Sequence, residues 1–185
     1  MAQQDGLRLS GHVVAIARDK DGNILWKEEG SNILFQYGLW YWASLLSGPP
    51  QSVESIYMLP IQAATNPNSN LPVLNYLDRH GFHPGWVEVT NYQEPTRPLW
   101  DNMVIETPEP TEPLEPFRVS NPVGVLFTIS TTPTYIGGVA LITKNNTKNN
   151  VILAQFLAAK AFSAVRVLNA SDVLEVKYSI FFTNS

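Results

Sequence analysis

The sequence has 185 residues, with 12 Lys and Arg against 16 Asp and Glu, a formal net charge of −4, and no cysteine. The lack of cysteine excludes a disulfide framework, a thiolate zinc site and a cysteine nucleophile. No cluster of cations is present of the kind that binds nucleic acid phosphates. No apolar stretch approaches the roughly 20 residues of a membrane-spanning helix, and the first six residues form no secretory signal. We therefore expect a soluble protein with no nucleic acid or membrane partner.

The composition favours β structure. Only 15% of the residues are charged, against roughly 25% in typical soluble domains, whereas 44% are hydrophobic. Glycine (11) and proline (14) are frequent. These two residue types interrupt regular elements, so we expect many short strands and turns in a single domain over residues 1–185.

The first expected element is a hairpin. Residues 7–18 and 23–27 are rich in β-forming residues, and the four residues between them end in Asp-Gly, a strong turn signal. A helix over residues 34–47 should follow, capped by Ser31 or Asn32 and ended by Gly48. Apolar residues occupy both faces of this helix, so we expect it to be buried or to contact a partner.

The middle of the chain gives weaker signals. We expect a strand over residues 55–59 that ends at Pro60, then a loop over 62–70, and short strands at 87–90 and 103–105. Residues 71–86 show no clear pattern. Prolines at near-alternate positions predict a stiff, extended segment over 107–116, and residues 1–6 could form an N-terminal arm.

The last third predicts five strands, over residues 122–130, 135–143, 151–158, 162–168 and 173–183. Gly137 and Gly138 suggest a bulge. In the final strand, alternate residues should face the core: Leu174, Val176, Tyr178, Ile180 and Phe182. Together these elements predict an all-β fold, an antiparallel, jelly-roll-like β-sandwich with one short helix after the first hairpin.

Charged residues are unevenly distributed. Between Glu29 and Asp78 the only charge is Glu54, and residues 119–143 contain none. We expect some strands there to be covered on both faces, either by the same chain or by another subunit. The candidate residues for a subunit interface are Tyr37, Trp40, Tyr41, Trp42, Tyr57, Pro108, Pro110 and Pro113.

Few residues suggest catalytic chemistry. Asp78, His80 and His83 form the best metal-like group, but Gly81 opposes the helical spacing that two ligands would need, so we expect neither a metal nor a cofactor. Glycan hydrolysis would need two carboxylates across a cleft, and the candidates are Glu88, Glu94, Asp101 and Glu106. Glycan binding without catalysis is the stronger option, with Trp86, Tyr92 and Trp100 as stacking surfaces. No phosphate-binding or nucleophile-elbow motif is present, so we expect no enzyme activity.

A series of short motifs extends along most of the chain: residues 19–22, 32–34 with Gly38, 45–48, 56–58, 127–129, 138–143, 161–163, and Asp172 before the last strand. This order resembles that of small β-sandwich virion proteins of tailed bacteriophages. The resemblance implies a capsid decoration or cement protein, made in the host cytoplasm and located at the capsid surface. It also implies contact with the major capsid protein and with copies of the same chain, as a trimer. The alternative is a tail-associated or receptor-binding module that binds a glycan.

Overall fold

The computed structural model describes residues 7–47, 55–62, 87–106, 117–143, 146–148 and 155–184. The suggested N-terminal arm over 1–6 and the proline segment over 107–116 lie outside these residues.

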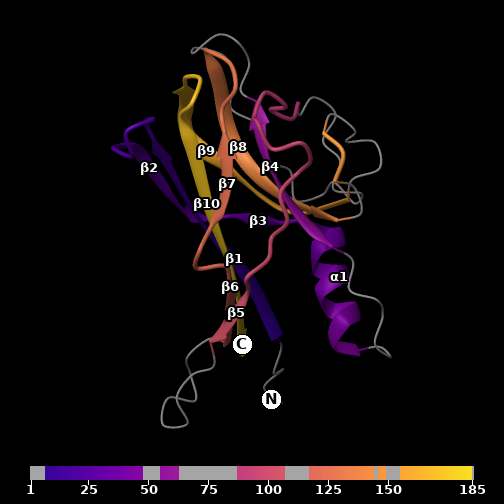
Figure 1. Cartoon of the computed structure of the whole chain (residues 1–185). Coiled ribbons are helices and arrows are strands. Elements are labelled where there is room, and N and C mark those ends of the chain that lie inside the picture. The colour runs from indigo at the N-terminus through magenta and orange to yellow at the C-terminus, as the bar shows by residue number, and fades with distance from the viewer. Residues whose placement is uncertain are drawn as a thin grey trace.

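Two antiparallel sheets make up the described part of the chain (Figure 1). The six-stranded sheet has the order β2 (Ile24–Ser31), β1 (Leu7–Arg18), β10 (Val173–Asn184), β6 (Phe117–Ser120) and β5 (Val104–Glu106), and β7 (Val125–Thr128) also pairs with β10. The four-stranded sheet has the order β3 (Ile33–Leu34), β9 (Gln155–Leu168), β8 (Thr134–Thr143) and β4 (Ile56–Gln62). A helix, α1 (Gln36–Ser47), follows β3. The expected all-β antiparallel sandwich with one short helix is confirmed.

The first hairpin forms where the sequence predicts it. One carboxylate oxygen of Asp19 accepts hydrogen bonds from the backbone N–H groups of Asp21 and Asn23, each at 2.9 Å. Gly22 has φ 87°, a left-handed conformation that glycine adopts without steric cost. These features close the turn between β1 and β2.

The long ladder between β1 and β10 is the centre of the six-stranded sheet. It runs without interruption from Leu7 opposite Asn184 to Arg18 opposite Val173. Alternate residues point into the sandwich, and the fully buried ones are Val13, Ala15, Ala17, Leu174, Val176 and Ile180. The alternation predicted for the last strand is therefore confirmed, although Phe182 is only partly buried.

In the four-stranded sheet, β4 and β8 are buried on both faces along most of their length, whereas the second half of β9 is partly exposed. The inner face of this sheet shares one core with the six-stranded sheet, through residues such as Met58, Leu141 and Phe162. Its outer face carries a second apolar cluster of Phe35, Leu59, Ile61, Ala140, Ile142, Phe156 and Ala159. All of these residues are buried within the single chain. The lack of charge in β4 and β8 therefore reflects covering by the chain itself.

Three strand predictions are wrong in detail. Pro60 does not end β4, which continues to Gln62. The N–H groups of Met58 and Gln62 point away from β8, and Pro60 lies on that same side of the strand, where it removes no ladder bond to β8. The strands expected at 151–158 and 162–168 are one continuous strand over the described residues, β9.

Three further predictions concern short segments. Residues 87–90 form an isolated bridge at Glu88 rather than a strand. The strand expected over 122–130 is shorter, because residues 121–124 form a turn before β7. The expected bulge in β8 is confirmed by a register shift between Ile136 and Gly138.

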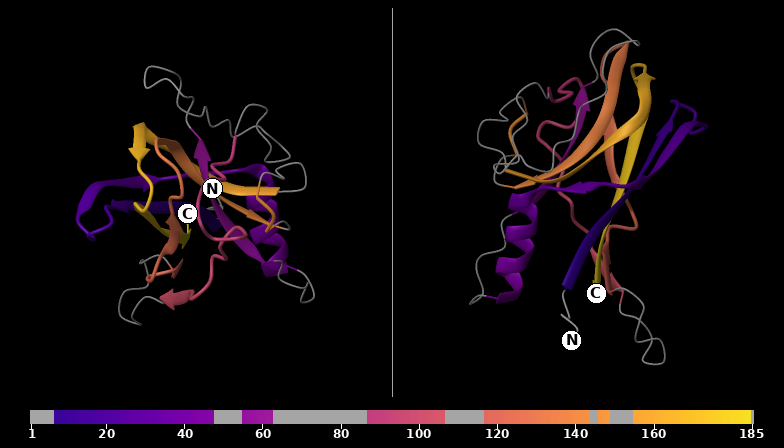
Figure 2. Two further views of the ribbon diagram at one scale, coloured as in Figure 1. Left: turned by 45° about the horizontal axis from the view of Figure 1, so that its top comes forward. Right: turned by 180° about the vertical axis from the view of Figure 1, so that it is seen from behind.

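Helix α1 stands beside the sandwich, at the end where β1 begins and β10 finishes (Figures 1 and 2). It is held close to β9 because Gly38 has no side chain: a β-carbon there would lie 2.0 Å from the carbonyl oxygen of Leu157. That carbonyl also accepts the backbone N–H of Phe35 at 3.1 Å. The helix is therefore fixed at its first turn.

Candidate functional site

Residues 87–100, here called the crossing segment, begin and end on the same edge of β4. Val87 and Val89 lie beside Gln62 and Pro60, and Pro98 and Trp100 lie beside Met58 and Ile56. Four backbone hydrogen bonds of 2.7–3.0 Å make these contacts. The residues in between therefore leave the edge of the four-stranded sheet and return to it.

The middle of the crossing segment reaches the other sheet. The N–H of Gln93 donates to the carbonyl of Thr128 at 2.8 Å, and the N–H of Ser130 donates to the carbonyl of Asn91 at 2.9 Å. The carboxylate of Glu94 accepts the N–H of Thr128 at 3.1 Å. The crossing segment thus connects β4 in one sheet with β7 and the residues after it in the other.

A buried ion pair joins the two ends of the crossing segment. The guanidinium of Arg97 donates two hydrogen bonds to the carboxylate of Glu88, at 2.9 Å from Nε and 2.7 Å from Nη2. Both side chains are fully buried. The hydroxyl of Tyr92 donates to the same carboxylate at 3.4 Å. Burial and the charge of Glu88 raise the pKa of Tyr92 well above its ordinary value, so its phenol remains protonated.

Lys148 binds the middle of the crossing segment. Its ammonium donates to the carbonyl of Tyr92 at 2.6 Å and lies 3.7 Å from the centroid of that ring. Burial lowers the pKa of Lys148, an effect that the charges of Glu94 and Glu88 oppose. The backbone N–H of Arg97 donates to the carbonyl of Asn146 at 2.8 Å. The crossing segment is therefore held by β4, by β7 and the residues after it, and by residues 146–148.

The carboxylates considered for glycan hydrolysis all have structural partners here. Glu88 binds Arg97, and Glu94 binds the backbone of β7. Asp101 is exposed and accepts a hydrogen bond from Asn102, and Glu106 pairs with Arg118. This arrangement makes the first two carboxylates part of the framework.

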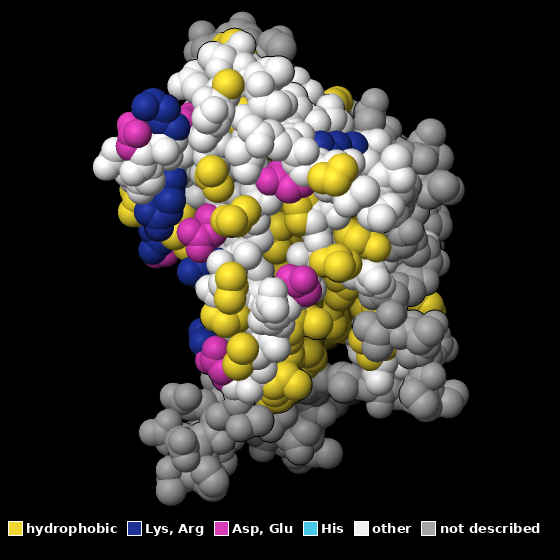
Figure 3. All heavy atoms as spheres, in the orientation of Figure 1, with side chains coloured by type: hydrophobic (Ala, Val, Ile, Leu, Met, Phe, Trp, Pro, Cys, Tyr) yellow, Lys and Arg dark blue, Asp and Glu magenta, His cyan; other side chains and the backbone are white. Residues whose placement is uncertain are grey.

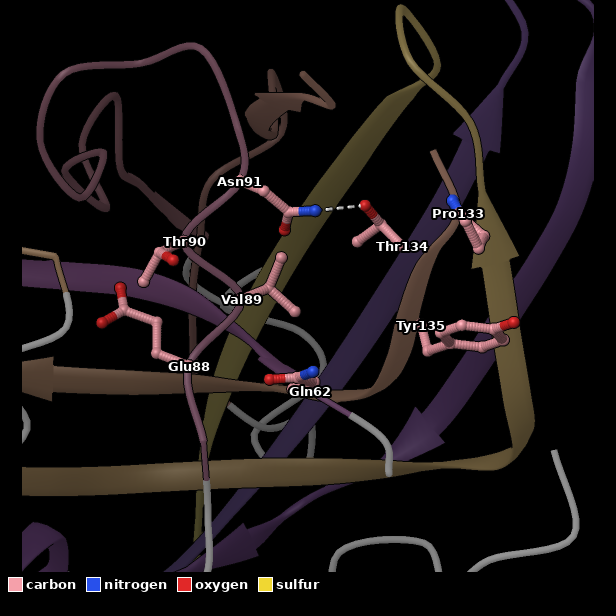
Figure 4. A pocket seen from close by; sticks show the side chains of 8 residues that line it. All are labelled: Gln62, Glu88, Val89, Thr90, Asn91, Pro133, Thr134 and Tyr135. Atoms are coloured by element: carbon pink, nitrogen blue, oxygen red, sulfur yellow. Dashed lines mark hydrogen bonds between the residues drawn. The ribbon is translucent and has the colours of Figure 1, made fainter. Parts of the chain in front are cut away.

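A cavity of about 420 Å³ lies between the crossing segment and the start of β8. Residues 88–91 form one wall, Gln62 lies at the base, and Pro133, Thr134 and Tyr135 form the opposite wall (Figure 4). A hydrogen bond from Asn91 to Thr134 spans the two walls. The sequence could not reveal this cavity, because three separate segments form it.

The predicted glycan-stacking residues are in the core where the structure describes them. Trp100 is 2% exposed and packs edge-to-face against Trp42 and Tyr178. Tyr92 is 3% exposed and packs edge-to-face against Phe127. Neither ring has a free face on which a sugar could stack. Trp86 lies outside the described residues.

The predicted interface residues differ in exposure. Tyr41 is buried, and Tyr37, Trp42 and Tyr57 are partly buried against the two apolar clusters. Trp40 is 60% exposed and lies 5.5 Å from the ring of Tyr37. The three predicted proline contacts, Pro108, Pro110 and Pro113, lie outside the described residues.

A second exposed apolar group lies at the outer strand of the six-stranded sheet. Met103, Val104 and Ile105 are 44–63% exposed. Figure 3 shows hydrophobic side chains gathered over the lower part of this face, around β5 and β6. The sequence predicts a strand over residues 103–105 but does not show that these three side chains are exposed.

Within the described ranges, no group of three or more His, Asp or Glu is arranged to hold a metal ion, and no helix is long and apolar enough to cross a membrane. Asp78, His80 and His83 lie outside those ranges. Comparison with protein-family models, curated proteins and solved structures finds no match for this chain.

Proposed function

We propose that this chain is a non-enzymatic structural protein of a tailed-phage virion, a decoration or cement protein at the capsid surface. In this role it binds the major capsid protein and copies of itself in a trimer. The motif order described above supports this assignment. The structural observation that carries it is the exposure of Trp40 on a helix without any charged residue.

The helix presents Trp40 on a rigid support. Gly38 allows its backbone to touch β9, and Tyr41 is buried in the core. A tryptophan held in this way loses little further freedom when a partner covers it, and exposed aromatic anchors often contribute most of the binding energy of an interface. No charge on α1 has to be desolvated when the surface is covered.

The exposed group on β5 supports the same role. An outer strand that carries exposed apolar side chains favours pairing or covering by another chain. Met103, Val104 and Ile105 would contribute a second contact, separate from the helix. Static contacts of this kind suit a protein that joins neighbouring capsomers.

Two tryptophans two residues apart allow a matched test. Trp40→Ala removes an exposed ring and should leave the free energy of unfolding within about 0.5 kcal/mol of the original value. Trp42→Ala removes a ring packed on the core and should destabilise the fold by roughly 3–5 kcal/mol. Circular dichroism during urea denaturation measures both effects.

The Trp40→Ala variant should also lower the oligomer mass measured by light scattering, and should reduce binding to purified capsids that lack this protein. Mass spectrometry of purified particles should find the chain in a fixed ratio to the major capsid protein. A chain that is absent from the particles, or a Trp40→Ala variant that assembles and binds capsids as before, contradicts the proposal.

A further inference from the structure

The cavity between the crossing segment and β8 has the properties of a small-ligand site. We propose that it binds a neutral, hydroxyl-rich ligand of the size of a mono- or disaccharide. Its volume of about 420 Å³ falls within the range of known small-molecule pockets, roughly 300–1,000 Å³. This inference does not depend on the proposed virion role.

The cavity has fixed walls. The amide nitrogen of Asn91 donates to the hydroxyl groups of Thr131 and Thr134, and the hydroxyl of Thr134 donates to the carbonyl of Thr131 at 2.8 Å. In the wall formed by residues 88–91, the N–H of Val89 donates to the carbonyl of Pro60 on β4 at 2.9 Å. Because these contacts hold both walls before a ligand arrives, little ordering accompanies binding.

Most of the lining residues are polar and uncharged. Five of them carry amide or hydroxyl groups: Gln62, Thr90, Asn91, Thr134 and Tyr135. The amide of Gln62 and the hydroxyl of Thr90 can donate as well as accept hydrogen bonds, as sugar hydroxyls do, whereas Asn91 and Thr134 use their donors within the walls and offer acceptors. In Figure 4 the ring of Tyr135 is turned away from residues 88–91, so apolar contact with a sugar comes from Val89 and Pro133.

The same lining disfavours charged and apolar ligands. It contains no Lys or Arg to balance an anion, and the carboxylate of Glu88 is bound to Arg97. In Figure 4 this carboxylate is turned away from Tyr135 and Thr134, so Glu88 supplies part of the wall. Val89 and Pro133 are the apolar lining residues, too few to hold a lipid chain.

Saturation-transfer difference NMR on the intact chain tests the proposal, because it detects weak binding of small molecules. The probes are glucose, galactose, N-acetylglucosamine and maltose, with glucuronate and inorganic phosphate as anionic comparisons. At least one neutral sugar should give a signal, and the anions should give none. Gln62→Ala and Thr90→Ala should each weaken the affinity by about tenfold, equivalent to one or two lost contacts.

Tyr37→Ala is the matched control, since it removes a partly buried tyrosine on α1 and should leave sugar binding unchanged. If Gln62→Ala does not fold by circular dichroism, Thr90→Ala alone decides the test, because Thr90 is exposed. The absence of a signal from all four sugars overturns the proposal, as does a signal that survives the cavity substitutions or is matched by glucuronate or phosphate. Capsid binding, in contrast, should be unaffected by Thr90→Ala.

Discussion

The α-carbon of Gly38 in α1 lies against the backbone carbonyl of Leu157 in β9. A β-carbon at position 38 would lie 2.0 Å from the carbonyl oxygen and 2.8 Å from the carbonyl carbon. Backbone atoms within a sheet cannot rotate away as a side chain can. We expect Gly38→Ala to lower the free energy of unfolding by about 1–3 kcal/mol, as overpacking does.

The sign of this effect is informative, because replacing glycine by alanine inside a helix normally stabilises by roughly 0.5–1 kcal/mol. Ala43→Gly, at an exposed position of the same helix, gives the ordinary helix-propensity effect as a control. Urea denaturation of the two variants provides the comparison. A more stable Gly38→Ala variant would show that α1 does not touch β9.

A double-mutant cycle can test the buried ion pair between Glu88 and Arg97. Glu88→Gln or Arg97→Met alone leaves one charge buried without its partner, and each should destabilise the fold by roughly 3–5 kcal/mol. The double variant leaves no buried charge, so it should be more stable than the sum of the single effects implies. Additive single effects, measured by chemical denaturation, would contradict the buried pair.

Glu28 gives a pH dependence with a defined sign. Its carboxylate, on β2, accepts hydrogen bonds from the N–H and hydroxyl of Ser163 and from Arg166, at 2.6–3.0 Å, and so connects the two sheets. Burial raises the pKa of Glu28, but the hydrogen bonds from Arg166 and Ser163 outweigh burial and hold this pKa below its ordinary value of 4.5. The contacts of the Glu28 carboxylate with Ser163 and Arg166 therefore stabilise the fold above pH 4.5. This contribution is lost as the pH falls through the lowered pKa of Glu28.

We expect Glu28→Gln to have a lower melting temperature than the original chain at pH 7, and a difference that shrinks as the pH falls below 4.5 through the lowered pKa of Glu28, where this carboxylate becomes protonated. Glu29→Gln is the control. It changes an exposed neighbour that pairs with Lys27 at the surface, and surface pairs contribute little. A difference for Glu28→Gln that stays constant with pH would contradict this assignment.

Tyr178 buries a hydroxyl group that has no hydrogen-bond partner among the described residues. Burial raises the pKa of this phenol well above its ordinary value, so the group stays neutral. A buried unsatisfied hydroxyl costs about 1–3 kcal/mol. Tyr178→Phe should therefore raise the free energy of unfolding, while the contact between its ring and Trp100 is kept. A loss of stability would mean that a buried water molecule bonds this hydroxyl.

Local sequence signals predicted the elements whose cause is local. The Asp19 turn and the alternation in β10 depend on neighbouring residues, and both are confirmed. Pro60 misled the prediction of β4 because only the sheet order shows that its missing N–H faces away from β8. Composition alone could not distinguish a core tryptophan such as Trp100 from one that binds a ligand.

The candidate site was much less predictable. Glu88 and Arg97 meet because both ends of the crossing segment lie on β4, and nothing in their nine-residue spacing indicates this. The cavity likewise requires Gln62 and Tyr135 to be neighbours at the end of the four-stranded sheet. Long-range pairing of strands brings such residues together, and the local periodicity of the sequence does not predict which strands pair.

The pairing of β1 with β10 makes the central ladder of the six-stranded sheet a long-range contact. Residues 7–18 pair with residues 173–184 along the whole length of both strands. Until these partners meet, β1 has only β2 of its two ladder partners, and an isolated two-stranded hairpin is barely stable in water. The six-stranded sheet therefore cannot form from local contacts alone, and we expect the slow folding that is typical of β proteins whose strands pair across long stretches of sequence.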